Sequence, residues 1–250
     1  MATLSFITIE GIPIVKQGDD IAELIAQALE KIPLRLERGD VAIVCQKIVS
    51  KAEGRVVRLK DVEPTELANR IAARWEKEPR AVEVVLRQTN RVVRMDRGVI
   101  IVETGPGWVC ANAGVDESNS IADGLAILLP EDPDASAARI RAGLKRIAGV
   151  DVAVLITDTF GRPWRDGLTE VCLGIAGMNP LLDLRGTMDL GGHELHHTVV
   201  AVADELACAA GLLMQKAAGV PAVIARGYKY EPSEGSAKAL IRPAEADLFR

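Results

Sequence analysis

The sequence predicts a mixed α+β fold that is neither a Rossmann nor a P-loop domain. Two short apolar runs, residues 41–45 and 152–156, have the length and β-branched content of buried strands. Residues 21–31 instead place apolar side chains at helical spacing, so the chain contains helices as well as strands. No GxxxxGK[ST] stretch occurs, and after the turn at residues 104–107 Cys110 replaces the third glycine of a dinucleotide fingerprint. Both nucleotide-binding folds are therefore rejected.

Periodicity and prolines predict the elements of the N-terminal half. Asp19 and Asp20 precede the helix at residues 21–31, and Pro33 ends it. Pro79 interrupts a second helical pattern, because proline lacks the backbone donor that a helix interior requires. In chain order we expect a strand at 6–9, a helix at 21–31, a strand at 41–45, helical segments at 65–77 and 81–88, and strands at 91–95 and 99–103.

The same kinds of pattern predict the elements of the C-terminal half, where two carboxylates are expected to cap helices. Asp134 is expected to cap the helix at residues 135–147, and Asp204 a helix that runs through Lys216. The polar residues 157–167 and the glycine-containing residues 181–192 are typical of loops. Strands are expected at 125–129, 152–156, 171–176, 198–203 and 222–225.

Composition describes an ordinary globular chain, and 250 residues suffice for one large domain or two interleaved lobes. With a net charge of −5 and 3% aromatic residues, a nucleic-acid partner is not expected. No apolar run approaches the ~20 residues of a membrane span, and the N-terminus lacks the basic region of a signal peptide. The four scattered cysteines form no CxxC pair, which favours free thiols in the cytoplasm.

The most charge-rich stretch, residues 157–167, directly follows a buried strand. Ligands of open α/β sheets bind at the carboxyl ends of strands. Asp158 and Thr159 offer hard oxygens to a divalent cation, and Arg162 and Arg165 offer forked donors to a phosphate or carboxylate. The alternative is a connector with solvated surface charges. We favour a functional loop.

Two further segments carry candidate ligands. In residues 112–119, Asp116 is a second candidate metal carboxylate and Asn119 a candidate contact to a base or sugar, although an Asx-rich turn explains the segment equally well. Lys47 and Lys51 follow the strand at residues 41–45, where they could contact phosphates or simply be solvated at a sheet edge.

Residues 193–197, HELHH, match the HExxH signature of zinc peptidases and contain all three histidines of the chain. The signature requires a helix that puts both histidines on one face. Here it runs into the β-branched residues 198–202, and a strand would point His193 and His196 to opposite faces. A zinc metallopeptidase is therefore a minor alternative.

Several of these segments together resemble one family, the coenzyme F420-0:L-glutamate ligases, also called F420-0 gamma-glutamyl ligases. The resemblance extends from Ile9 to about Gly227 and depends on blocks that occur in the same order. These blocks are Gly11-Ile12-Pro13-Ile14, residues 46–55 (QKIVSKAEGR), residues 114–119 (GVDESN), residues 157–165 (TDTFGRPWR) and residues 204–207 (DELA).

The resemblance implies a two-lobed mixed α+β fold, built as a single ligase unit over residues 1–250, that forms an intertwined homodimer. It implies GTP as co-substrate and manganese or magnesium as cation, and leaves potassium open as an additional ion. The implied reaction joins L-glutamate to F420-0 and then adds further gamma-linked glutamates. The implied nucleotide contacts are Gly11, Ile12, Pro13, Ile14, Gln46, Lys51 and Asn119, and the implied metal contacts are Asp116, Asp158, Thr159 and Gln215.

These residue types suit amide formation through an acyl phosphate, since a carboxylate must be activated before an amine can displace its oxygen. Such catalysis is mainly positioning and charge neutralisation. We expect Asp158 and Lys51 to act on the transferred phosphoryl group, and Arg162 or Arg165 to clamp a substrate carboxylate. A glutamate ligase for another carboxylate acceptor, or a nucleotide- or metal-binding module without turnover, remains open.

Overall fold

A mixed sheet forms the centre of the computed structural model, which describes residues 3–116, 124–215 and 218–247. Within these residues six strands follow the order β1-β12-β2-β8-β9-β13. β2 and β8 are parallel, with Val41 opposite Ala153, and the other neighbouring pairs are antiparallel. This order differs from the doubly wound parallel sheet of a Rossmann domain. The strands of this sheet are β1 (Ser5–Thr8), β2 (Val41–Cys45), β8 (Ala153–Arg162), β9 (Arg165–Met178), β12 (Ala222–Arg226) and β13 (Pro232–Ser233).

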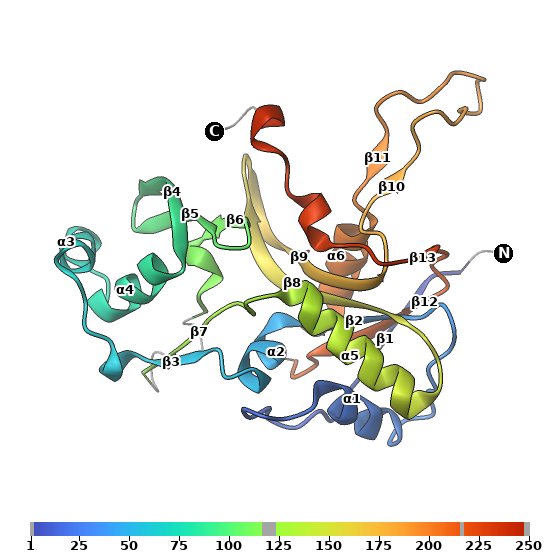
Figure 1. The fold of residues 1–250 in the computed structure, drawn as a ribbon, viewed down its shortest axis with the longest axis horizontal. Helices are drawn as coiled ribbons and strands as arrows, with labels where there is room; N and C mark the ends of the chain where they lie inside the picture. The colour runs from blue at the N-terminus through green and yellow to red at the C-terminus, as the bar shows by residue number, and fades with distance from the viewer. Residues whose placement is uncertain (1–2, 117–123, 216–217, 248–250) are drawn as a thin grey trace.

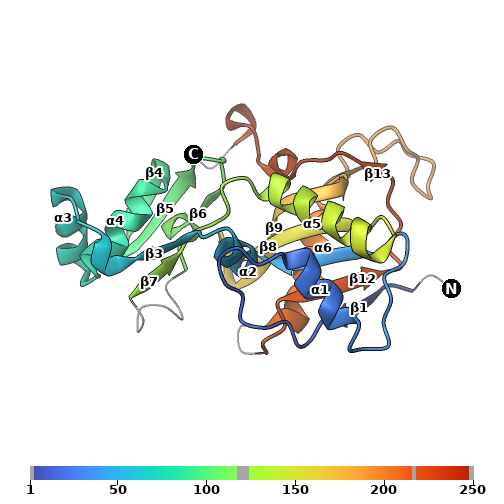
Figure 2. The same cartoon turned by 60° about the horizontal axis from the view of Figure 1, so that its bottom comes forward.

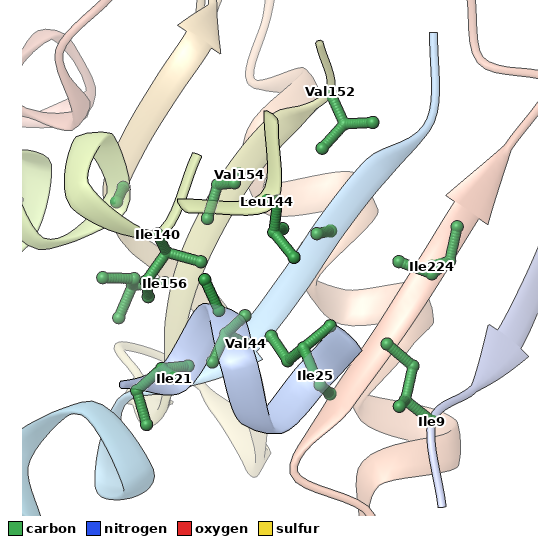
Figure 3. Packing of buried hydrophobic residues seen from close by; sticks show 14 of the residues in the cluster. Ile9, Ile21, Ile25, Val44, Ile140, Leu144, Val152, Val154, Ile156 and Ile224 are labelled. Carbon is green, nitrogen blue, oxygen red and sulfur yellow. The ribbon is translucent and has the colours of Figure 1, made fainter. Parts of the chain in front are cut away.

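Helices cover both faces of the sheet, and this explains why its central strands are apolar throughout. In β2, Ala42 and Val44 face one hydrophobic core, whereas Val41 and Ile43 face another. Figure 3 shows the first core, in which Ile25 and Leu144 pack against Val44 and Ile224. The helices on that face are α1 (Ile21–Leu29) and α5 (Pro133–Ala148), and the helix on the other face is α6 (Val202–Met214).

The connection between the parallel strands β2 and β8 carries a smaller body with its own core. Ile71, Val85, Ile100 and Val102 belong to that core. Both ribbon views place this body beside the six-stranded sheet (Figures 1 and 2). Its elements, after the short helix α2 (Gln46–Ala52), are β3 (Val56–Arg58), η1 (Leu59–Asp61), α3 (Glu66–Trp75), α4 (Pro79–Arg87), β4 (Thr89–Asp96), β5 (Val99–Thr104), β6 (Val109–Ala111), η2 (Asn112–Gly114) and β7 (Leu125–Ile127).

An arm between β9 and α6 stands off the body of the molecule (Figure 1). β10 (Leu182–Asp183) and β11 (Val199–Val200) pair at its base. Leu190 in this arm is fully exposed. The C-terminal segment then adds β13 to the edge of the sheet beside β9, and it ends in the short helices η3 (Ala237–Leu240) and η4 (Ala244–Ala246).

Most of the predicted elements are confirmed, with boundaries shifted by a few residues. The cap predicted at Asp134 is wrong, because α5 begins at Pro133 and Asp132 caps it by accepting from the Ala135 N–H at 3.0 Å. The helix expected at residues 21–31 ends at Leu29, and Pro79 is the first residue of α4 rather than a break within one helix. Residues 104–107 form the predicted turn, in which the Gly107 N–H donates to the Thr104 carbonyl at 2.9 Å. The four cysteines are free, as predicted, and Cys110 and Cys172 are buried. None of the described helices is both long and apolar enough to cross a membrane.

Three predictions near the site are wrong. Residues 157–167 are not a loop: β8 runs on to Arg162, β9 starts at Arg165, and the turn holds Pro163 and Trp164. The polar side chains of this stretch are compatible with strands because cross-strand pairing satisfies the backbone.

Residues 198–203 contain the strand β11 and then the start of α6 at Val202. Asp204 therefore lies in the first turn of α6 and accepts a hydrogen bond from the Cys172 N–H at 2.8 Å instead of capping the helix. Lys216, the predicted last residue of this helix, lies outside the described residues.

Candidate active site

A cavity of about 1710 Å³ opens where α2, β8, β9 and α6 meet the residues just before β7. Segments far apart in the sequence line it, because β2 and β8 are neighbours and α6 packs against β9. The residues predicted as ligands that line it are Ile12, Pro13, Ile14, Gln46, Lys51, Asp116, Asp158, Thr159 and Gln215.

Asp158 lies in β8 on the wall of this cavity. Burial, together with the nearby carboxylates of Glu170 and Asp116, raises the pKa of its carboxyl from 3.8 to about 7. Gln46 partly offsets this effect. Because the Ser50 hydroxyl donates to Gln46 Oε1 at 2.8 Å, the amide Nε2 is the group that Gln46 turns toward Asp158 Oδ1, at 3.5 Å. The raised pKa therefore reflects mainly the burial of this carboxyl, and to a smaller extent its two acidic neighbours.

Asp116 reaches the same cavity from the smaller body. Two backbone hydrogen bonds hold it against Ile127, at 2.9 and 3.1 Å, so the position of its Cα is fixed by β7. Its Oδ2 lies 2.5 Å from the Nζ atom of Lys47, on α2. Asp116 and Asp158 are therefore close enough for the charge of one to raise the pKa of the other.

Thr159 and Glu170 face each other across the β8–β9 hairpin. The two residues are register partners, and the Thr159 hydroxyl donates to Glu170 Oε1 at 2.6 Å. This donation leaves lone pairs on the hydroxyl oxygen. α6 passes directly over Glu170 at Gly211, where a Cβ would collide with the Glu170 side chain.

These oxygen donors fit a divalent cation chemically. Mg²⁺ and Mn²⁺ favour carboxylate and hydroxyl oxygens, and a cation would stabilise the ionised form of Asp158, which burial and the neighbouring carboxylates disfavour. Within the part of the chain that the structure describes, no three His, Cys, Asp or Glu side chains are arranged as a metal site by themselves.

The segment of residues 11–14 and Gln215 lie at the rim. Ile12 packs against the first core, whereas Ile14 is 83% exposed. Gly11 does not line the large cavity but a neighbouring one of about 500 Å³, and both cavities share Gln215, Gly219 and Val220. Gln215 ends α6, and its Nε2 donates to the Leu212 carbonyl at 3.2 Å. Its Oε1 is thus the group it can offer to a cation.

The structure does not bring Arg162 and Arg165 to the cavity wall. They flank the turn of the β8–β9 hairpin and are exposed, and Arg162 Nη2 donates to the Asp166 carbonyl at 3.1 Å. Trp164 between them is 77% exposed and has a positive φ of 57°. Asn119 lies outside the described residues.

Sequence reasoning missed three acidic residues of the cavity, Glu170, Asp204 and Glu205. Pro163 predicts a turn, but a two-residue turn alone would pair Thr159 with Leu168. The register shift between Gly161 and Arg162 is what brings Glu170 opposite Thr159, and no local pattern in the sequence signals it. Asp204 was interpreted as a helix cap, whereas its carboxylate accepts a hydrogen bond from the Cys172 N–H.

The HELHH stretch is not helical, since residues 193–197 lie in the arm between β10 and β11. His193, His196 and His197 are exposed. His193 lies 3.6 Å from Asp189, and His196 lies 3.7 Å from Glu194. The glutamate that should serve as base in a zinc peptidase is therefore next to one of the histidines and does not share a helical face with both.

Comparison with known proteins supports the resemblance noted in the sequence. The family model described as F420-0:Gamma-glutamyl ligase matches residues 11–227. The chain is 48% identical over 250 residues to the coenzyme F420:L-glutamate ligase of Methanothermobacter thermautotrophicus, covering 99% of each chain. It is 48% identical to the Methanopyrus kandleri enzyme of the same name, over the full length of both, and 42% identical to the Archaeoglobus fulgidus one, over 97% of this chain and 94% of that one. The chain therefore belongs to the F420-0:gamma-glutamyl ligase family.

Proposed function

We propose that this chain is a coenzyme F420:L-glutamate ligase that uses GTP and a divalent cation, manganese or magnesium. Family membership over the full length supports the ligase activity. The observation that supports the nucleotide and cation chemistry is the convergence of Asp116 and Asp158 on one cavity from segments 42 residues apart in the sequence.

In this proposal the cation is held by Asp116, Asp158 and Thr159, with Gln215 completing the protein ligands. A divalent cation there would neutralise phosphate oxygens, and water and those oxygens would fill its remaining coordination positions. Potassium is an additional monovalent ion that the acidic wall at Glu170 and Asp204 would tolerate. The nucleotide would lie along residues 11–14, Gln46 and Lys51, with Asn119 as a further contact.

The reaction begins when a carboxylate oxygen of the acceptor attacks the γ-phosphorus of GTP, and GDP leaves. The amine of L-glutamate then attacks the acyl carbon, phosphate leaves, and the nitrogen loses a proton as the amide forms. Lys51 would stabilise the charge on the transferred phosphoryl group. The walls of the cavity would hold acceptor and nucleotide in line and exclude water, which competes with the amine for the acyl phosphate.

Arg162 and Arg165 must act at a distance from the cavity wall if they contact substrate at all. The acceptor carries a deazaflavin ring system beyond its reacting carboxylate, so part of it would extend out of the cavity. We assign to Arg162 and Arg165, beside the exposed Trp164, contacts to this outlying part of the acceptor.

The assembly we propose is a homodimer of single ligase units located in the cytoplasm. In each unit the six-stranded sheet and the smaller body are the two lobes. The exposed Leu190 and Met188 in the arm are apolar side chains that a second copy would cover. Light scattering of the purified protein at micromolar concentration tests the dimer, and a monomer at all concentrations would exclude it.

One incubation tests the proposed reaction directly. The protein is mixed with F420-0, L-glutamate, GTP and Mn²⁺, and the deazaflavin product is analysed by mass spectrometry. We expect a mass increase of one glutamate residue or several, with GDP formed only when both acceptor and glutamate are present. An unchanged acceptor would contradict the proposal.

A glutamate ligase for a different carboxylate acceptor is the second candidate. It is compatible with the same cavity, since Asp116 and Asp158 would act on the nucleotide and not on the acceptor. The same mass measurement with a mixture of carboxylate metabolites separates the two candidates, because only the accepted carboxylate gains glutamate.

A further inference from the structure

Lys47 and Asp116 form an ion pair on the wall of the cavity, and both side chains are partly buried. The Nζ–Oδ2 distance is 2.5 Å, and the side chains are 24% and 21% exposed. Lys47 belongs to α2 at the end of the six-stranded sheet, whereas Asp116 is anchored to Ile127 in the smaller body. The pair therefore links α2 to the segment that precedes β7 across the cavity.

We propose that Lys47 is the built-in counter-ion of Asp116 in the cation-free protein, and that a divalent cation must displace its ammonium group before it can use this carboxylate. The inference rests on the proposed function, because it takes Asp116 as a cation ligand. It adds a role for Lys47, which competes with the metal ion for one of its ligands.

Charge balance gives the physical reason. The cavity wall carries the carboxylates of Asp116, Asp158 and Glu170, and a site with several unpaired negative charges is unfavourable in a partly buried position. An ammonium group at 2.5 Å neutralises Asp116 while no cation is bound. Lysine suits an exchangeable partner, because its point charge sits on a flexible four-carbon stem and needs no fixed geometry.

This competition has a consequence for the order of binding. A divalent cation that arrives alone has to break the ion pair and leave the ammonium beside two positive charges. A cation that arrives with a triphosphate brings negative oxygens to which the released ammonium can turn. Cation and nucleotide should therefore bind cooperatively, and part of this coupling should originate at Lys47.

The test measures Mn²⁺ binding in the absence of nucleotide. The EPR signal of free Mn²⁺ reports how much of the ion remains unbound. Lys47→Met keeps the length of the side chain and removes its charge. We expect it to tighten Mn²⁺ binding roughly 3- to 10-fold, the effect of removing a partly exposed competing ion pair. Lys77→Met is the matched control, since Lys77 also lines the cavity, and it should change Mn²⁺ affinity by less than about twofold.

The inference is overturned if Lys47→Met binds Mn²⁺ no more tightly than the parent, or if Lys77→Met tightens binding equally, because the effect would then be general electrostatics. Absence of Mn²⁺ binding to both parent and Lys47→Met also overturns it. The product-mass assay decides the ligase activity separately, so the two failures can be distinguished.

A second measurement uses the unaltered protein and does not depend on whether the variant folds. Lysine acetylation is quantified by peptide mass spectrometry with and without Mn²⁺. If Mn²⁺ displaces the Lys47 ammonium group from Asp116, the ion should increase the acetylation of Lys47 relative to Lys77. The reason is that a released amine is more reactive than an ion-paired one. Labelling of Lys47 that stays constant or falls would contradict the displacement.

Discussion

The acidic cavity and the histidine-bearing arm are two regions that both carry residues typical of metal sites, and they differ in every structural respect. In the arm the candidate ligands are adjacent in sequence, exposed and paired with neighbouring acids. In the cavity they come from α2, β8, β9 and the residues before β7, and they are partly buried. A local field strong enough to retain a cation requires convergence and burial of the ligands more than closeness in sequence. The cavity meets this requirement and the arm does not.

The largest expected effect comes from removing the carboxylate of Asp158 from the wall of the cavity. Asp158→Asn should lower the rate of glutamate ligation about 1000-fold, or about 4 kcal/mol of barrier, because a cation ligand and its charge are lost together. Asp166→Asn, on the same hairpin but exposed, is the control and should retain activity. Steady-state GDP release and product mass measure both, and an active Asp158→Asn variant would refute the site.

The pH dependence of stability is the next largest effect. In the unfolded chain the Asp158 carboxyl loses its proton near its ordinary pKa of 3.8, whereas in the folded protein it keeps the proton up to about pH 7. The folded state therefore loses stability as the pH rises from about 4 to 7. In chelator-treated protein at pH 8, Asp158→Asn should be more stable than the parent by about 2–4 kcal/mol.

The same substitution should change stability by less than about 1 kcal/mol at pH 4, where the carboxyl is protonated in the folded state and still partly protonated in the unfolded chain. Urea unfolding at both pH values gives the comparison. If Asp158→Asn raised the free energy of unfolding equally at pH 4 and pH 8, then changed packing, and not the charge of Asp158, would be the cause.

A smaller effect is expected at the hairpin tip, outside the cavity. Arg165→Met should raise the KM for F420-0 about tenfold, or about 1.4 kcal/mol, and leave the KM for GTP unchanged. Arg94→Met removes an exposed arginine of the smaller body and is the control. If both Michaelis constants stay constant in Arg165→Met, then the tip does not contact the acceptor.

The smallest effect is expected in the arm. Replacing His193, His196 and His197 together by alanine should change ligation by less than about twofold and stability by less than about 0.5 kcal/mol, because the three side chains are exposed. Metal analysis of the parent and the triple variant should show no bound zinc in either. Zinc in the parent, together with a peptidase activity that the triple variant loses, would restore the metallopeptidase alternative.

Much of the fold could be predicted because its signals are local. Apolar runs revealed β2 and the first half of β8, and periodicity with proline revealed α1, α4 and α5. The β8–β9 hairpin was not predicted, because its strands extend beyond the core. There, charged residues take the place of the alternating apolar residues that indicate a strand. The start of α6 was misplaced since Asp204 looks like a cap, although its carboxylate serves the backbone of another strand.

The site could be predicted in its composition but not in its pairings. Asp116, Asp158 and Thr159 were predicted as ligands from residue type and from family resemblance. The structure places all three on one cavity, and their role as ligands stays a prediction. The Lys47–Asp116 and Thr159–Glu170 contacts depend on strand register and on the placement of the smaller body. Neither is encoded in local spacing, and for the same reason the distance of Arg162 and Arg165 from the cavity could not be foreseen.

The central claim is that Asp116 and Asp158 together hold a cation in this cavity, and anomalous diffraction at the manganese edge tests it most directly. Crystals grown with GDP and Mn²⁺ should show an anomalous peak within coordination distance of both carboxylates, with Lys47 turned away from Asp116. A peak at His193, His196 or His197, or no peak between Asp116 and Asp158, would contradict the account.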